Sequence, residues 1–397
     1  MRNHSEAWLG AAEDALRAAA PTALPSAARE LLTTHVRASE VTLLLADYGL
    51  DVLQPVTHLP HTGTRVPVRD GAPAGRAFAT QTPVLEVTDD PGTVIAHLPI
   101  TVRGDRLGVL SVRCPESAKG APAVLDLAAF ATALGHELVV ADRDTDLYRQ
   151  ARRRRRLTLA AEMQWQLLPG RGFSRQEYTL GGHLEPAYAI GGDNFDWSTT
   201  EDFLTLTVTD GQGHGIDAAL LTNLAVNALR NARRAGVSLA EQACLADQAV
   251  YAEYGGERYA PSLLLRFDLA TGRAQAVEAG SPQLFRFRGG LVEQVMFEAQ
   301  TPLGMFEETD YRHQSFTVAP GDRLVIVSSG VHGSPSPDGS AFGERALKET
   351  VAATGRSSAH ETARALVDGL IQHQGGSELA KDAVVVCLDW NGRPSSP

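Results

Sequence analysis

The pattern of apolar and polar positions in residues 200–234 predicts a strand followed by a helix. Apolar residues alternate with threonines at Leu204, Leu206 and Val208, which is the period of a half-buried strand. The strand ends at Asp210 in a glycine-rich turn, and apolar residues then recur at helical spacing through 220–228. A carboxylate carried into such a turn suits a hard, oxygen-liganded cation, because the backbone can approach the ion closely. The same pattern also arises where an aspartate only satisfies the amides of its own turn.

Short apolar runs and tight turns continue through the rest of the C-terminal half and predict antiparallel hairpins. The expected strands are 262–268, 273–279, 283–290, 291–297, 313–318 and 323–329. The expected helices lie near 216–235, 239–253, 343–353 and 359–373. In the N-terminal half we expect a helix around 31–36, a strand at 41–45, and a hairpin of 98–102 and 107–112. The fold class is therefore α+β.

A long helical connector is expected between the two halves. Residues 124–168 contain no proline and a single glycine, and apolar residues recur at helical spacing from Leu127 to Leu138. Such a helix could pair with a second copy in a homodimer. The apolar pattern lapses at 142–146, where charged residues gather. The arginine block 152–156 is either solvated or docks on an acidic surface.

Composition narrows the class of protein. A chain of 397 residues is long enough for two domains. Its formal net charge of -11 disfavours a nucleic-acid partner, which requires a basic surface. The three cysteines are far apart and fit a reducing compartment. No run reaches the ~18 uncharged apolar residues of a membrane span, so we expect a cytoplasmic protein with no membrane partner.

The C-terminal motifs resemble a known family. They are AIGGDNFDW (189–197), LTLTVTDGQGHGIDAALL (204–221), GSPQLFRF (280–287), TPLGMF (301–306), APGDRLVIVSSG (319–330) and KDAVVVCLDW (381–390). In this order they resemble the metal-dependent PPM (type 2C) protein-serine phosphatases of the SpoIIE-like branch, over roughly 160–390. The resemblance implies an αββα sandwich. It also implies Mn²⁺ or Mg²⁺ ions that activate a water for attack on phosphorus, with no protein nucleophile.

The resemblance assigns roles to several residues. Asp193 and Asp210 are the expected catalytic, metal-site carboxylates, and the Gly211 carbonyl lies beside Asp210. Asp196 is expected to support the metal site rather than to bind the ion. His214, in the glycine turn, either contacts the substrate phosphate or fills the loop.

Two positions depart from the family pattern. Ser329 stands where the family has an aspartate after the 323–329 strand, and Lys381 replaces the first of two aspartates near the C-terminus. Both missing carboxylates belong to the same second metal ion, and an inward lysine would place an ammonium near Asp210. We therefore expect one Mn²⁺ or Mg²⁺ site to remain intact, while the second is doubtful. Asp382 is a candidate substitute, but alternation along a strand would turn it to the opposite side from residue 381.

The N-terminal half resembles a GAF sensor domain. The resemblance rests on a turn helix at Gly71–Phe78 and on the hairpin of residues 98–112. It implies either a pocket for a small ligand or a ligandless domain used for dimerisation or docking. The expected organisation is a helical segment (1–25), a GAF-like domain (26–140), a helical connector (141–168), a phosphatase domain (169–391) and a disordered tail (392–397).

These observations leave three functional hypotheses. The first is a sensor-regulated, metal-dependent protein-serine/threonine phosphatase. Its substrate would be a phosphorylated regulatory protein such as an anti-sigma antagonist, and its activity would be weakened at Ser329 and Lys381. The second is a pseudophosphatase that binds a partner and transmits the sensor state by contact. The third makes the GAF-like half the main function, as a ligand-binding dimer.

Overall fold

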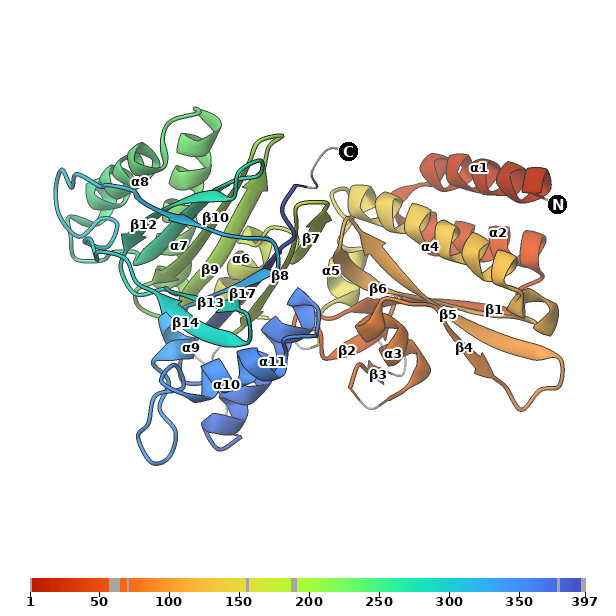
Figure 1. The fold of residues 1–397 in the computed structure, drawn as a ribbon. Coiled ribbons are helices and arrows are strands. Elements are labelled where there is room, and N and C mark those ends of the chain that lie inside the picture. The colour runs from red at the N-terminus through yellow and green to blue at the C-terminus, as the bar shows by residue number, and fades with distance from the viewer. Residues whose placement is uncertain are drawn as a thin grey trace. The chain divides into compact units, whose positions relative to one another are not determined.

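The chain folds into two compact units of mixed α and β structure (Figure 1). In this computed structural model the described residues are 2–56, 65–69, 71–154, 157–186, 191–376 and 379–393. The N-terminal unit is residues 1–156 and the C-terminal unit is residues 157–397. Positions 189 and 190 of the first motif, and the end of the expected tail from 394 onward, lie outside the described residues.

The N-terminal unit is built on a six-stranded antiparallel sheet in the order β3-β2-β1-β6-β5-β4. Its strands are β1 (Glu40–Ala46), β2 (Val52–Pro55), β3 (Val66–Pro67), β4 (Val84–Val87), β5 (Thr93–Val102) and β6 (Asp105–Pro115). Its helices are α1 (Arg2–Ala18), α2 (Leu24–Val36), α3 (Pro73–Thr80), α4 (Ala121–Ala141) and α5 (Leu147–Ala151). The predicted helix around 31–36, the strand at 41–45 and the 98–112 hairpin are confirmed. Helix α3 overlaps the predicted turn helix. The assignment to the GAF family stays a prediction.

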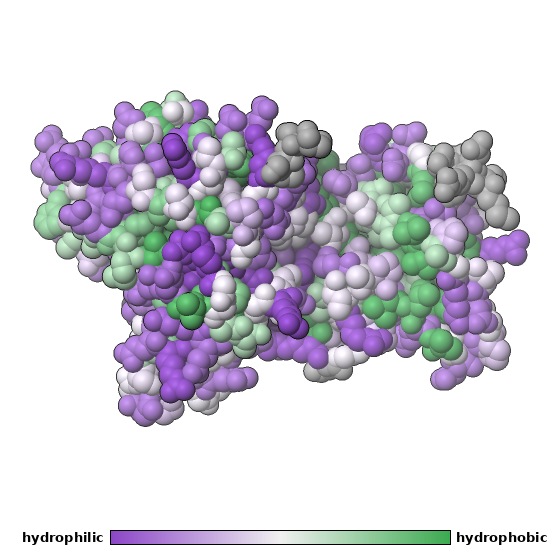
Figure 2. Space-filling model, in the orientation of Figure 1, coloured by the Kyte–Doolittle hydropathy of each residue, from purple (hydrophilic) through white to green (hydrophobic). Residues whose placement is uncertain are grey.

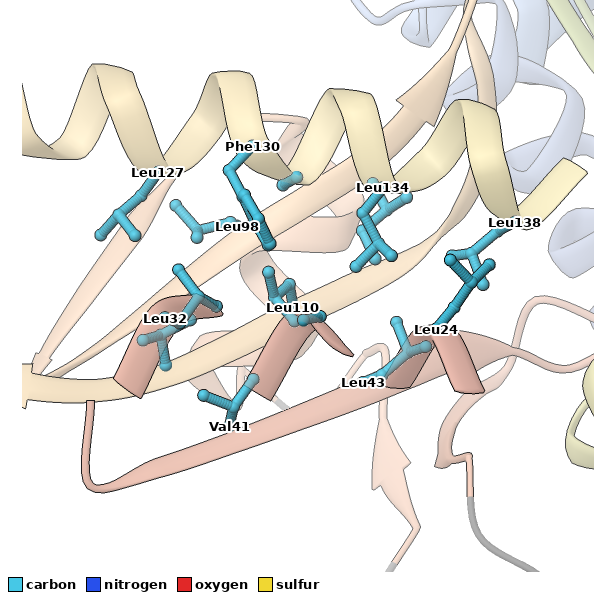
Figure 3. Close-up of a cluster of buried hydrophobic side chains, with 14 of the residues drawn as sticks. Leu24, Leu32, Val41, Leu43, Leu98, Leu110, Leu127, Phe130, Leu134 and Leu138 are labelled. Carbon is cyan, nitrogen blue, oxygen red and sulfur yellow. The ribbon is translucent and has the colours of Figure 1, made fainter. Parts of the chain in front are cut away.

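Helix α4 supplies much of the core of this unit. Its inward side chains point at the sheet and at α2 (Figure 3), and they are Leu127, Phe130, Leu134 and Leu138. They contact the same cluster as Leu98 of β5 and Leu110 of β6. By length and composition alone α4 is also the one described helix that could cross a membrane. In this fold its apolar stripe is buried against the sheet.

The expected continuous helix over 124–168 is wrong. The chain instead forms α4, α5 and α6 (Leu159–Leu167), separated by non-helical segments. Tyr148 and Ala151 of α5 are buried in the core of the N-terminal unit, so α5 is not a free connector. Helix α6 has its own N-cap residue, Thr158, whose hydroxyl accepts a hydrogen bond from the amide of Ala161. The lapse in apolar periodicity at 142–146 is where the first helix ends.

The described arginines of the 152–156 block are used inside the N-terminal unit. Arg152 donates from Nε to the carbonyl of Ala46, and its guanidinium lies over the ring of Tyr48, 5.3 Å from the centroid. Arg154 pairs with Asp51 at 3.3 Å. Arg152 therefore has a structural role, while the exposed Arg154 docks on an acid of the chain itself, which is one of the two expected alternatives.

The C-terminal unit contains two antiparallel sheets. The first has the order β15-β12-β11-β10-β9 and the second β14-β13-β16-β17-β8-β7. Its strands are β7 (Gly172–Arg175), β8 (Tyr178–Glu185), β9 (Gly192–Thr199), β10 (Phe203–Gly211), β11 (Ser262–Asp268), β12 (Arg273–Ala279), β13 (Gln283–Arg288), β14 (Leu291–Val295), β15 (Gln314–Thr317), β16 (Asp322–Val327) and β17 (Ala383–Trp390). Besides α6, the helices are α7 (Gly215–Arg234), α8 (Leu239–Tyr254), α9 (Ser329–His332), α10 (Ala346–Ala353) and α11 (Ala359–His373).

These elements form four layers. Helices α7 and α8 pack on the first sheet, and α10 and α11 pack on the second. The sheets face each other where β9 meets β8 and β17. The layers are those of the predicted αββα sandwich. The surface shown in Figure 2 has hydrophobic residues scattered among hydrophilic ones over both units.

Strand β10 differs from its predicted half-buried form. Its threonines are also buried, at 8%, 4% and 1% exposure for Thr205, Thr207 and Thr209. Period-two alternation reports the polarity of a face, not its accessibility. Here the polar face lies on the side of the sheet that α7 covers, because α7 packs directly on β9 and β10.

Candidate functional site

The two expected catalytic aspartates lie directly opposite each other. In the antiparallel register of β9 and β10, Asp193 is the cross-strand partner of Asp210, and their carboxyl groups are hydrogen-bonded. Both side chains face the space between the two sheets. Phe195 shares a face of β9 with Asp193 and lies close to Gly182 on β8 of the opposite sheet. Strand pairing thus brings together two residues that are 17 positions apart.

Two glycines next to these aspartates permit a close backbone approach. Gly192 and Gly211 are also cross-strand partners. A Cβ atom on Gly211 would lie 2.2 Å from Oγ1 of Thr222 on α7. That hydroxyl donates to the carbonyl of Gly192 over 2.6 Å. The glycines therefore let α7 pack closely against the ends of the strands that carry the acids. The role of the Gly211 carbonyl as a metal ligand stays a prediction.

Uncharged donors hold the Asp210 carboxylate. Its Oδ2 accepts hydrogen bonds from Oγ of Ser281 at 2.6 Å and from the amide of Ser329 at 3.1 Å. Burial raises the pKa of Asp210, but the hydrogen bonds from Asp193, Ser281 and Ser329 outweigh it and leave that pKa below its usual value. Ser329 thus acts on Asp210 as a hydrogen-bond donor, and its place at a family metal-ligand position stays a prediction.

Asp193 is in the opposite electrostatic situation. Burial, and then the negative charges of Asp210 and Asp382, raise the pKa of Asp193 well above its usual value. A hydrogen bond from Ser328 acts in the other direction without reversing the shift. Among the described residues, no donor reaches Oδ2 of Asp193, although this atom is buried.

Asp382 joins this cluster, contrary to the expectation from strand alternation. It is 2% exposed, and its Oδ2 accepts a hydrogen bond from Nε2 of Gln164 at 2.5 Å. The same Gln164 nitrogen donates to the carbonyl of Asp193 at 3.0 Å. Lys381, in contrast, is exposed. Residues 381 and 382 do differ in burial as alternation predicts, and the error was to take residue 381 as the inward one.

Asp196 and His214 lie outside the cluster. Asp196 is three positions after Asp193, so it faces α7, where its carboxylate pairs with Arg230 at 2.8 Å and Arg233 at 2.9 Å. The expected supporting role at the metal site is therefore corrected to an anchor for α7. His214 is exposed at the N-cap position of α7, and its side chain does not cap the helix. Its contact with a substrate phosphate stays a prediction.

Sequence reasoning did not single out Gln164, Ser281, Ser328 or His332. Ser281 and Ser328 stand inside recognised motifs, but a hydroxyl carries no signal that tells a donor to a carboxylate from a turn residue. Gln164 comes from α6, far from the motifs. His332 donates from Nε2 to the carbonyl of Ser281 over 2.9 Å, and burial lowers the pKa of its imidazole.

The donor set fits one hard divalent cation. Among the described residues, no three or more His, Cys, Asp or Glu side chains are grouped closely enough to form a complete protein cage for a metal. Mg²⁺, however, is commonly bound through one or two carboxylates and keeps several waters. The orphaned Oδ2 of Asp193 and the mutual repulsion of three carboxylates both favour a cation at this place. Asp193 and Asp210 would hold it.

Comparisons with known proteins find similar sequences and folds. Residues 200–391 match the family model of Stage II sporulation protein E (SpoIIE). The chain is similar to the protein IcfG of Synechocystis sp., with 21% identity over 244 residues, which are 54% of this chain and 38% of IcfG. It is also similar to the phosphoserine phosphatase RsbP of Bacillus subtilis, with 23% identity over 130 residues, 32% of each chain. The chain thus spans about a third of the length of these relatives.

Solved structures of similar domains are also found. The SiaA-PP2C domain of Pseudomonas aeruginosa matches with a TM-score of 0.48 and 24% identity, over 53% of this chain and 85% of that one. The PP2C phosphatase domain of SpoIIE from Bacillus subtilis, with a fragment of its regulatory domain, matches with a TM-score of 0.47 and 21% identity, over 56% and 66%. From the family match and the ordered motifs, residues 200–391 form a PPM-type phosphatase domain of the SpoIIE family.

Proposed function

We propose that this chain is a sensor-regulated, metal-dependent protein-serine/threonine phosphatase. Its substrate is a phosphorylated regulatory protein, such as an anti-sigma antagonist. The observation that carries the proposal is the pair of carboxylates Asp193 and Asp210, set opposite each other between the sheets with Asp382 beside them. The similarity to a phosphoserine phosphatase of Bacillus subtilis supports the reaction class.

The roles of the residues follow from their contacts. When bound, Mn²⁺ or Mg²⁺ supplies positive charge for the phosphoryl oxygens and lowers the pKa of a water. Asp193 and Asp210 bind the ion, and Ser281 and Ser329 fix the orientation of the Asp210 carboxylate. Gln164 fixes Asp382 and the backbone of Asp193 from the opposite side. Orientation by buried donors matters because a carboxylate that rotates away loses the ion.

The regulatory part of the proposal rests on the order of elements. Helix α6 is the first described helix of the C-terminal unit, and it begins at Leu159, three positions after the N-terminal unit ends at residue 156. Its Gln164 bonds directly to two residues of the acidic cluster. A signal from a GAF-like N-terminal unit that shifts α6 would therefore change the geometry of Asp193 and Asp382.

A pseudophosphatase is the second candidate, and a specific observation favours it. Ser329 and the exposed Lys381 supply no carboxylate for a second ion, and Oδ2 of Asp210 already accepts two uncharged donors. A site that is satisfied in this way can stay folded without metal. In that case the domain would bind a phosphoprotein and transmit a signal without hydrolysis.

Phosphate release distinguishes the two candidates. The full chain is incubated with Mn²⁺ and a phosphoserine protein, and inorganic phosphate is measured for wild type, Asp210→Ala and Asp202→Ala. Asp202 is an exposed aspartate just before the other end of β10, so it controls for removal of a charge. The phosphatase function predicts release by wild type and Asp202→Ala and none by Asp210→Ala. Equal rates in all three would reject it.

A further inference from the structure

A cavity of about 260 Å³ opens beside the acidic cluster. It is smaller than the roughly 300–1,000 Å³ of sites for drug-sized ligands, so it suits a single side chain. Its walls come from the end of β12, the following turn, the start of β13, the end of β14 and α9. The lining residues used below are Glu278, Ser281, Pro282, Leu284, Val295 and His332.

The cavity shares a wall with the candidate catalytic site. Ser281 lines the cavity, and its Oγ donates to the Asp210 carboxylate at 2.6 Å. His332 also lines it and donates from Nε2 to the carbonyl of Ser281. A protein substrate that places its phosphoserine at Asp210 therefore brings a neighbouring side chain to this cavity.

The lining combines an apolar wall with one acid. Pro282, Leu284 and Val295 supply apolar surface, and Glu278 is the single acidic residue among the described residues that line the cavity. Burial raises the pKa of Glu278, which means that its charge is poorly solvated there. The one basic group is His332, and because burial lowers its pKa it is neutral near pH 7. Among the described residues that line the cavity, no positively charged side chain then offsets the Glu278 carboxylate.

We propose that this cavity is a specificity subsite for a lysine or arginine side chain of the substrate, close in sequence to the phosphoserine. The aliphatic stem packs along Pro282, Leu284 and Val295, and the cationic end meets the Glu278 carboxylate. An apolar side chain would leave the acid buried without a partner, and an acidic one would be repelled. This inference rests on the proposed function and names a feature of its substrate.

The test uses phosphoserine peptides of one alanine-based sequence. Each carries a single lysine at one of the four positions nearest the phosphoserine, or norleucine, which has a similar shape without the charge, at the same position. The proteins are wild-type full chain, Glu278→Gln and Glu298→Gln. Glu298 is an exposed acid close to the cavity but not part of its lining. The quantity compared is the ratio of kcat/KM for the lysine and the norleucine peptide within each protein.

The subsite predicts that wild type prefers lysine by about tenfold or more at one or more positions, as expected for a charge-assisted contact. Glu278→Gln brings this ratio close to one, while Glu298→Gln keeps it. A wild-type ratio of one at all positions, or the same ratio in wild type and Glu278→Gln, overturns the subsite. If wild type hydrolyses no peptide, the phosphatase function fails separately. In that case the lysine preference is measured as a ratio of dissociation constants by fluorescence anisotropy. The same values of this ratio support or overturn the subsite.

Discussion

The backbone amide of Ser329 donates a hydrogen bond to Oδ2 of Asp210 across 3.1 Å. Ser329, which stands where the resemblance predicts a metal-ligand aspartate, thus stabilises the carboxylate of Asp210. The bond ties the start of α9 on the second sheet to the end of β10 on the first. An uncharged donor from the second sheet thus helps to hold one of the three clustered acids.

A carboxylate introduced at position 329 should make the acidic cluster depend more strongly on a bound cation. Ser329→Asp is expected to raise the affinity for Mn²⁺ by at least about tenfold and to lower the metal-free stability by roughly 2 kcal/mol. The reason is that a further negative charge faces Asp210, where only a cation neutralises it. Calorimetric Mn²⁺ titration and urea unfolding in EDTA measure the two effects. Ser315→Asp, on exposed edge strand β15, is the control and should change neither.

Removing Gln164 should disturb the acidic cluster from the side of α6. Gln164→Ala deletes donors to Asp382 and to the backbone of Asp193. We expect a loss of about 1–3 kcal/mol of stability, because a buried carboxylate loses one of its hydrogen-bond donors, together with weaker Mn²⁺ binding. Gln166→Ala, an exposed position on the same helix, is the matched control. Equal Mn²⁺ affinities in the two variants would show that Gln164 does not orient the site.

Asp196 separates a structural aspartate from the site aspartates. Asp196→Ala leaves Arg230 and Arg233 without their shared carboxylate on a largely buried surface. Breaking such a pair typically costs about 3–5 kcal/mol. We therefore expect a large drop in urea midpoint with unchanged Mn²⁺ stoichiometry. If Asp196→Ala is still folded but no longer binds Mn²⁺, Asp196 belongs to the metal site after all.

The acid stability of the C-terminal unit should depend on Asp322. Burial raises the pKa of Asp322, but hydrogen bonds from Arg288 and the Ala319 amide outweigh it and lower that pKa. Because the pKa is lower in the folded state, the stabilisation is present above the unfolded pKa of about 3.9. It is lost as the pH falls through the folded value.

Asp322→Asn should therefore destabilise the protein by about 2 kcal/mol at pH 7, and the difference should shrink below about pH 4. Urea unfolding of both proteins across this range measures it. A difference that is constant with pH would mean that charge plays no part in the effect of Asp322.

Much of the fold followed from local pattern. The predicted strands and helices after residue 200 lie within a few positions of the observed ones, because each has a clear period and a turn with glycine, proline or a capping residue at its end. The prediction of a continuous connector was wrong because it carried the helix past the lapse in apolar periodicity at 142–146, where α4 ends. Its continuation depended on Tyr148, whose tertiary burial a local pattern does not show.

Some residues of the candidate site could likewise be predicted from the sequence, and others could not. Asp193 and Asp210 could be placed together because the resemblance to the phosphatase family assigns both to one metal site. The orientation of Asp382 could not, because it depends on where β17 begins, and that is set by pairing with β8 and β16. Asp196 looked like a site residue because it stands in the same motif, and only the strand register turns it toward α7.

Calorimetric titration of the full chain with Mn²⁺ tests the account most directly. One ion per chain should bind to wild type, and none of this heat should remain in Asp210→Ala or Asp193→Asn. Two ions per chain, or an unchanged titration in Asp210→Ala, would contradict a single cation held by these two opposed carboxylates.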